Sequence, residues 1–240
     1  MKFEHTIHVQ EQSRADDQSD SAFGQIGRDI LLFFIAAAVF FALTTGVIRL
    51  QQSPNRGLPY HDGFASSDIA EWTAYGGNWK VQDGTMVNES NERGAKLVTG
   101  SAYWKDYTVE ADVALRTSGD AGLIARVSDP EQGVDAYSGI YIGLRIRDEA
   151  LVLGVADHDW QEAQAKILST PIVPNSWYHI RVELKGCQVN AIVNRQDSTE
   201  LTRLDRMLDP CPLRGKIGLR SYDSGGIWKN VQVTKLDSSR

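Results

Sequence analysis

Tyr107-Thr-Val-Glu-Ala-Asp-Val-Ala-Leu-Arg116 alternates between two kinds of side chain along its length. The odd positions carry Tyr, Val, Ala, Val and Leu, whereas the charged residues Glu110, Asp112 and Arg116 all fall on even positions. Successive side chains of a β-strand point to opposite faces of the sheet. The pattern therefore predicts a strand with one face in a core and the other in solvent.

The same alternation recurs further along the chain, in residues 137–145, 179–184, 188–194, 216–222 and 228–233. Gly, Pro, Asn and Asp residues, which favour turns, lie between these segments. No segment of this region has the 3.6-residue period of a convincing amphipathic helix. Many short strands without helices are typical of β-sandwiches and barrels, so we predict an all-β domain over residues 60–237.

Several blocks of sequence resemble a known family. Trp72 is followed by Gly76-Gly-Asn-Trp79-Lys-Val-Gln-Asp-Gly84, and later blocks include Ala121-Gly-Leu-Ile-Ala-Arg-Val-Ser-Asp129 and Asn175-Ser-Trp-Tyr-His-Ile-Arg-Val-Glu183. In this order the blocks resemble the concanavalin A-like, laminin-G-type jelly rolls, and most of all the 3-keto-disaccharide hydrolase domain family and the lectin-like modules attached to glycosidases. The resemblance covers residues 60–236. It implies a jelly-roll β-sandwich that binds a sugar or cleaves 3-keto-glycosides.

The alternation also identifies side chains that point away from the core. If their strands share a sheet, one outer face carries carboxylates, guanidinium groups and tyrosines, namely Glu110, Asp112, Arg126, Tyr141, Arg145, Arg220 and Tyr222. Aromatic rings stack on the apolar face of a sugar, and carboxylates and arginines hydrogen-bond its hydroxyl groups. Solvent-facing ion pairs explain the same pattern. We take Arg126 and Tyr141 as the leading sugar ligands, whose replacement by alanine should weaken glycan binding without unfolding the domain.

Aromatic and acidic residues in predicted loops are further candidates. Trp104, Trp160 and Trp228 are possible stacking platforms, and Trp160 lies in the polar turn Ala156-Asp-His-Asp-Trp-Gln-Glu162. Cleavage of a 3-keto-glycoside by elimination needs a base for the acidified C–H bond. The same turn offers candidate catalytic groups, Asp157, His158, Asp159 and Glu162. A solvated charged loop is the alternative, and we favour it.

Other chemistries are disfavoured by the sequence. The jelly-roll enzymes of glycoside hydrolase family 16 carry Glu-x-Asp-x-x-Glu on one strand, whereas Glu110-Ala-Asp112-Val-Ala-Leu115 lacks the third carboxylate. No Ser-His-Asp or Cys-His triad, phosphate-binding loop or dinucleotide fingerprint is recognisable. A net charge of −6 disfavours a nucleic-acid partner.

Two cysteines and two aspartates bear on structural cross-links. Cys187 and Cys211 lie 24 positions apart in a predicted turn and loop. We predict a disulfide between them, with two free thiols in a cytosolic domain as the alternative. Related jelly rolls often hold a structural Ca²⁺ near the chain ends, so the resemblance makes Asp62 and Asp237 candidate calcium ligands. The His and Cys residues show no zinc-ligand spacing.

The run between Asp29 and Arg49 holds 19 uncharged, mostly apolar residues. As a helix it would reach roughly 28 Å, close to the hydrocarbon thickness of a bilayer. We predict a disordered tail at residues 1–28, a transmembrane signal-anchor at 29–49 and a linker at 50–59. A cleaved signal peptide is one alternative, but the polar segment before the run is too long for it. A buried helix is the other, but an unbroken apolar run does not fit an amphipathic helix. Basic residues flank both ends, so the predicted disulfide alone favours a domain outside the cytoplasm.

Together these patterns predict a membrane-anchored β-sandwich that binds carbohydrate. An enzyme that acts on 3-keto-glycosides is the first alternative, and a protein-interaction domain without a sugar site is the second. A deep pocket with acid, base and cation would favour the enzyme, whereas a groove with exposed Trp or Tyr would favour the binding module. An exposed apolar patch would favour the protein-interaction domain.

Overall fold

The computed structural model describes Phe33 and residues 57–236. The chain divides into two compact units, Met1–Pro54 and Asn55–Arg240, and the fold described below belongs to the second. The predicted tail, the predicted transmembrane helix, the linker up to residue 56 and Asp237 lie outside the described residues. Among the residues that are described, none belongs to a helix with the length and apolar character needed to span a bilayer.

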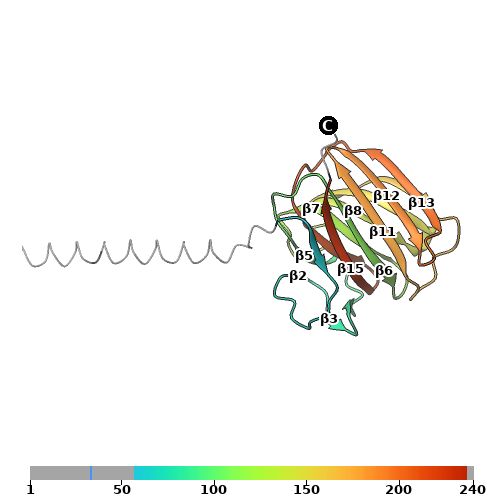
Figure 1. Ribbon diagram of the computed structural model, residues 1–240, viewed down its shortest axis with the longest axis horizontal. Coiled ribbons are helices and arrows are strands. Elements are labelled where there is room, and N and C mark those ends of the chain that lie inside the picture. The colour runs from blue at the N-terminus through green and yellow to red at the C-terminus, as the bar shows by residue number, and fades with distance from the viewer. Residues whose placement is uncertain (1–32, 34–56, 237–240) are drawn as a thin grey trace, which may run out of the picture. The chain divides into compact units, whose positions relative to one another are not determined.

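The first of two antiparallel sheets contains eight strands. Across the sheet the order is β13 (Glu200–Met207), β12 (Gln188–Arg195), β11 (Tyr178–Lys185), β6 (Tyr107–Leu115), β15 (Gly226–Lys235), β4 (Thr85–Asn88) and β3 (Trp79–Gln82), and β1 (Tyr60–Asp62) also pairs with β15. Figure 1 shows β11, β12 and β13 side by side in this layer.

The second sheet contains seven strands. Its order is β10 (Trp160–Ile167), β9 (Ala150–Asp157), β8 (Ser138–Arg145), β7 (Asp120–Ser128), β14 (Lys216–Tyr222), β5 (Ala95–Thr99) and β2 (Thr73–Tyr75). A short 3-10 helix, η1 (Ile146–Asp148), connects β8 to β9. The prediction of an all-β sandwich is confirmed, and the segments that alternate in sequence form β6, β8, β11, β12, β14 and β15.

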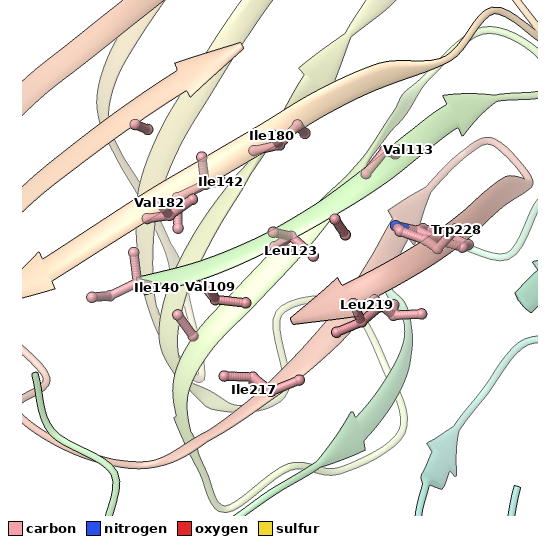
Figure 2. Packing of buried hydrophobic residues seen from close by; sticks show 14 of the residues in the cluster. Val109, Val113, Leu123, Ile140, Ile142, Ile180, Val182, Ile217, Leu219 and Trp228 are labelled. Atoms are coloured by element: carbon pink, nitrogen blue, oxygen red, sulfur yellow. The ribbon is translucent and has the colours of Figure 1, made fainter. Parts of the chain in front are cut away.

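The main core lies between the two sheets. Figure 2 shows part of it, with Val109 of β6 and Ile180 of β11 from the first sheet and Leu123 of β7 and Ile142 of β8 from the second. Trp228 of β15 is wholly buried there, and its indole nitrogen donates to the carbonyl of Gly122, 3.1 Å away in the other sheet. The idea that Trp228 is a loop platform is therefore wrong, because this side chain joins the two layers.

A second apolar cluster covers the outer side of the second sheet. It contains eight buried residues, among them Ile124, Tyr137, Tyr141 and Val152, and the partly buried Trp160 packs against it. Strict alternation between core and solvent predicts polar side chains at such positions. Here both sides of the sheet carry apolar side chains. The polar side chains of this outer face therefore pack against a layer of buried apolar side chains.

Cys187 and Cys211 form a disulfide, as predicted. It joins the turn between β11 and β12 to the loop between β13 and β14, with a Cα–Cα distance of 5.6 Å that is ordinary for a disulfide. The bond therefore holds the long connection between the two sheets against a hairpin of the first sheet.

We expect reduction of this disulfide to lower the free energy of unfolding by about 3 kcal/mol, because opening the loop returns conformational entropy to the unfolded chain. Urea denaturation of the full-length protein, with and without a phosphine reductant, measures the change. The double variant Cys187→Ser/Cys211→Ser is the control and should not respond to reductant. Identical urea midpoints for oxidised and reduced wild-type protein would contradict the expectation.

Candidate functional site

A pocket of about 430 Å³ opens on the outer side of the second sheet, where β7 begins and β8 and β14 end. We call it the Trp160 pocket. It is lined by Ser118, Gly119, Asp120, Asp135, Arg145, Arg147, Trp160, Arg220, Tyr222 and Asp223. Aromatic, cationic and acidic groups thus converge in one concave site, and converging polar groups of this kind can orient a small polar ligand.

Two aromatic rings are seated on glycines of the sheet. The Trp160 ring lies so close to Gly154 that a Cβ atom there would be 2.2 Å from it, and a Cβ atom at Gly143 would be 2.1 Å from the Tyr141 hydroxyl oxygen. The two rings meet edge to face with centroids 5.9 Å apart. Tyr141 is buried beneath the pocket, whereas Trp160 is only partly buried and lines it. Trp160 is therefore the ring that a ligand can reach.

Arg220 of β14 organises the acidic side of the pocket. One guanidinium nitrogen, Nη2, donates to Asp135 at 2.7 Å, and Nη1 donates to Asp120 at 3.2 Å. The guanidinium carbon lies 4.7 Å from the centroid of the Tyr141 ring, a cation–π contact. Because the Arg220 side chain is almost wholly buried, it holds both carboxylates in fixed positions.

Asp120 is a largely buried carboxylate of the pocket. Burial raises its pKa, even though the charge of Arg220 acts in the opposite direction. The Tyr141 hydroxyl donates to the same oxygen, Oδ1, at 3.1 Å, and no other described residue hydrogen-bonds the second oxygen. Asp120 therefore presents one oxygen to the pocket as an acceptor for a hydroxyl group or a proton.

Arg145 forms a rigid part of the rim. It makes two bonds to Asp148, at 2.8 and 2.6 Å, and a third to Glu162 at 2.7 Å. Tyr222 at the end of β14 accepts from Arg93 at 2.6 Å. These bonds fix the rim side chains before any ligand arrives.

Residues 60–234 match the family described as the 3-keto-alpha-glucoside-1,2-lyase-like domain. The chain belongs to this family. The matched region contains both sheets and the whole Trp160 pocket. No curated protein matches the chain.

Solved structures of similar fold include three sugar-related or uncharacterised domains. The carbohydrate-binding module CBM66 from Bacillus subtilis is 19% identical, with a TM-score of 0.57 over 69% of this chain and 96% of the module. A Bacillus subtilis protein of unknown function with a galectin-like fold is 15% identical, with a TM-score of 0.60 over 75% and 96%. The exoplasmic/lumenal domain of VIP36, bound to Ca²⁺ and Man3GlcNAc, is 14% identical, with a TM-score of 0.54 over 72% and 87%. These likenesses establish a jelly-roll fold of the galectin-like and concanavalin A-like kind.

The outward-facing set predicted from sequence does not form one surface in this family member. Tyr141, Arg145, Arg220 and Tyr222 do belong to the second sheet, as do the strands around the Trp160 pocket. Glu110 and Asp112 belong to β6, which pairs with β11 and β15 in the first sheet. The chain crosses between sheets after β6, so the two carboxylates face solvent on the other layer.

Arg126 is the clearest correction. Its side chain is wholly buried, and it donates to the carbonyls of Lys105, Gly186 and Pro212 and to the Asp106 carboxylate. The register of β7 against β8 shifts between Ala125 and Ser128, and Arg126 has a φ of 51° in the left-handed region. This bulge turns the side chain toward the loops at the end of the sandwich. Arg126 thus fastens three loops together and has little capacity left for a sugar.

The loop candidates are also separated by the fold. Trp104 is buried and packs against Tyr60 and Tyr107, with centroid distances of 5.9 and 6.2 Å, so it is a core residue rather than a platform. Asp157 is the exposed last residue of β9 and His158 and Asp159 form the exposed turn after it, whereas Glu162 is bound to Arg145. The four acid and base candidates therefore do not share one pocket.

Asp62, a predicted calcium ligand, hydrogen-bonds the protein through both carboxylate oxygens. One carboxylate oxygen accepts from the amide of Phe64 at 2.7 Å and the other from the Trp72 indole at 2.8 Å. Both oxygens thus already serve the turn after β1. Among the residues described, no cluster of three or more His, Cys, Asp or Glu side chains is arranged to hold a metal ion.

Asp120 and Asp135 are not among the site residues that the sequence predicts. Asp120 follows Ser118-Gly119 and reads as part of a turn, and Asp135 lies in the connection between β7 and β8. Alternation assigns faces only within strands. The signal that identifies Asp120 is the pairing of its strand, because it lies opposite Arg145 on one side and Tyr222 on the other.

The outer face of the first sheet carries a separate charged cluster. His179 of β11 contacts Asp112 at 2.9 Å through Nδ1 and Glu110 at 3.8 Å through Nε2, and Arg181 pairs with Glu110 at 2.8 Å. Hydrogen bonding to Asp112 and then to Glu110 raises the pKa of His179 from its usual 6.5 to about 9. Cross-strand ion pairs explain this cluster fully as a solvent-facing sheet surface.

We expect this cluster to make stability depend on pH. A His with a raised pKa in the folded state stabilises fully below its unfolded pKa, and the contribution disappears as pH rises through about 9. His179 is partly exposed, so the loss should be small, about 3 °C in melting temperature between pH 6.5 and 9.5. Melting curves of wild-type protein and His179→Gln across this range measure it. A wild-type curve parallel to that of the variant would disprove the assignment.

Proposed function

We propose that the domain binds a carbohydrate ring in the Trp160 pocket. The observation that carries this proposal is the partly exposed Trp160 ring beside two carboxylates held by Arg220. Two proteins of similar fold support it, the carbohydrate-binding module CBM66 and the VIP36 exoplasmic/lumenal domain bound to Man3GlcNAc. The family description adds an α-glucoside oxidised at C3 as the preferred ring.

The pocket matches the chemistry of a sugar ring. The face of Trp160 can stack on the apolar C–H surface of the ring. Arg220 engages Asp120 and Asp135 each through Oδ1, which leaves the second oxygen of each to accept from sugar hydroxyls. Arg147 at the rim is exposed and can donate to a hydroxyl or carbonyl oxygen. Because Arg145 and Arg220 are already held by carboxylates, binding orders few side chains.

The test is calorimetric titration of the full-length protein with methyl α-glucoside and its 3-keto form. We expect the 3-keto compound to bind and Trp160→Ala to weaken it about tenfold, the usual scale of one lost aromatic contact. Trp177→Ala is the matched control, since Trp177 lies beside Lys229 on the first sheet. Binding of the 3-keto compound that does not depend on Trp160 would rule out this pocket.

Calcium is tested in the same titration. The VIP36 domain of similar fold carries Ca²⁺. The candidate calcium ligands in this chain are Asp62 and Asp237, which lie near the two ends of the predicted domain. Asp62 fits this role poorly because protein donors already use both of its oxygens. We therefore expect equal affinity in calcium chloride and in chelator, and a calcium requirement would point to ligands other than Asp62.

A second candidate function is elimination from a 3-keto-glycoside, favoured by the family and by the raised pKa of Asp120. The C3 ketone acidifies the C2–H bond, and Asp120 would take that proton. The electron pair would form an enolate, whose oxygen a guanidinium of the pocket can stabilise. Collapse of the enolate would restore the C3 carbonyl, form the C1–C2 double bond and break the bond between C1 and the glycosidic oxygen, which would leave as an alcohol with the proton that Asp120 had taken from C2.

The membrane anchor also remains our proposal from the sequence. The apolar run at residues 29–49 would hold the sandwich outside the cytoplasm, and the Cys187–Cys211 disulfide supports an oxidising compartment. Alkaline extraction of membranes tests the anchor, and protease treatment of intact cells tests the side. Release by alkali, or protection of the domain in intact cells, would contradict the proposal.

A further inference from the structure

A second pocket lies at the opposite end of the second sheet. It has a volume of about 670 Å³, shares no lining residue with the Trp160 pocket, and opens where β7 ends and β8 and β14 begin. The two pockets come near each other at the β9–β10 hairpin, where Trp160, which lines the first, pairs with Ala156, which lines the second. We call it the Tyr103 pocket, after the residue at its mouth. Because the two pockets share no lining residue, we treat them as two sites.

The mouth of the Tyr103 pocket exposes large apolar side chains. Tyr103 is 68% exposed and Leu213 is 57% exposed, and Pro210 and Pro212 lie on the same rim. The exposed ring of Tyr103 is therefore available to stack on a ligand in the pocket. Its exposure here differs from that of the neighbouring Trp104, which is buried in the core.

Polar groups also line the pocket, where Ser128 and Asp157 are exposed and Ser138 is partly buried. Ser128, Ser138 and Asp157 line it, and the Ser138 hydroxyl donates to the Asp157 carboxylate. Arg214 at the rim is exposed. Arg126 also lines the pocket, and a purely apolar ligand would strip water from the Asp157 carboxylate without replacing its hydrogen bonds. The chemistry fits a neutral ring with one apolar face and several hydroxyl groups.

The wall of this pocket is held in place before any ligand binds. The disulfide ties Cys211 of the wall to Cys187, and Arg126 donates to the carbonyls of Gly186 and Pro212 at 2.5 and 2.8 Å. The connection between β13 and β14 would otherwise have to be ordered on binding, at a cost in conformational entropy. The disulfide at Cys211 and the hydrogen bond to Pro212 thus hold this loop in one conformation before a ligand binds.

We propose that the Tyr103 pocket is a second carbohydrate-binding site, with the Tyr103 ring as its stacking platform and the disulfide-held loop as its wall. It would let one chain hold two segments of a glycan, one in each pocket. Such bivalent contact raises the overall affinity for a long chain without any new contact at either site.

The test is a titration of ¹⁵N-labelled full-length protein with maltotetraose, cellotetraose and laminaritetraose. At least one of them should shift the amide signals of Tyr103, Leu213 and Ser138. Tyr103→Ala should weaken that binding at least tenfold, and Tyr103→Phe, which keeps the ring, should retain it. Arg147→Ala, at the exposed rim of the Trp160 pocket, should leave it unchanged, which separates this site from the first pocket. Val173→Ala serves as an exposed apolar control outside the pocket lining.

Two results would overturn the proposal. One is that none of the three tetrasaccharides shifts these signals, and the other is that Tyr103→Ala binds as wild type. A separate experiment tests the disulfide-held loop with the double variant Cys187→Ser/Cys211→Ser, after a check that this variant is folded. This variant should bind at least threefold more weakly at the Tyr103 pocket and unchanged at the Trp160 pocket, and equal binding at the Tyr103 pocket would remove the disulfide from the account.

Discussion

Arg126→Met is expected to lower the free energy of unfolding by at least about 3 kcal/mol, or roughly 10 °C in melting temperature. The methionine fills much of the same volume but leaves three carbonyls, those of Lys105, Gly186 and Pro212, without their donor. A fully buried acceptor that loses its partner costs on the order of 1–3 kcal/mol, and these three are partly buried, so we expect about 1 kcal/mol from each. Thermal and urea denaturation of the full-length variant measure the loss.

A matched control separates this effect from the loss of a positive charge. Arg181→Met also removes an arginine that pairs with a carboxylate, but Arg181 lies exposed on the outer face of the first sheet. Exposed pairs contribute about 0–1 kcal/mol, so the control should change little. If Arg126→Met melted like the wild type and bound sugar less tightly, Arg126 would be a ligand after all and the clamp would be disproved.

Asp120→Asn is expected to reduce turnover of 3-keto-α-glucosides at least 100-fold, if the domain is a lyase, while binding of the same compounds stays within a few fold. An amide keeps the shape of the side chain and can still hydrogen-bond a sugar, but it cannot take the C2 proton. The assay follows release of nitrophenol from a nitrophenyl 3-keto-α-glucoside, with calorimetry for binding. Asp223→Asn, at the exposed rim of the same pocket, is the control and should retain activity.

The outcomes of this experiment separate the two candidate functions. Wild-type turnover that falls with Asp120→Asn but not with Asp223→Asn makes the domain an enzyme with Asp120 as base. Binding without turnover in the wild type leaves a lectin-like module. Turnover that survives in Asp120→Asn would show that another group takes the proton, and the assignment of Asp120 would then be wrong.

The strands were predictable because their signal is local. The alternation in residues 107–116 requires only that neighbouring side chains point in opposite directions, and β6 follows it from Tyr107 to Leu115. The inward positions of Ile140, Ile142 and Leu144 on β8 follow by the same rule. The disulfide was predictable from an even cysteine count, without any knowledge of the fold.

The candidate site was only partly predictable, because it depends on pairings between distant segments. Arg220 meets Asp120 across 100 positions of sequence and Asp135 across 85. Trp160 was recognised as a large ring in a polar turn, but nothing in the sequence showed that it packs on Tyr141 and Gly154. Arg126 was misassigned because a bulge in β7 breaks the alternation at that residue.

The most direct test of the central claim follows the tryptophan indole signals of the ¹⁵N-labelled protein during titration with methyl 3-keto-α-glucoside. The chain has six tryptophans, which fall on different parts of the fold. The account predicts that the Trp160 indole signal shifts and saturates while the Trp177 signal, from beside Lys229 on the first sheet, stays in place. A titration in which Trp177 moves and Trp160 does not, or in which neither moves, would contradict sugar binding in the Trp160 pocket.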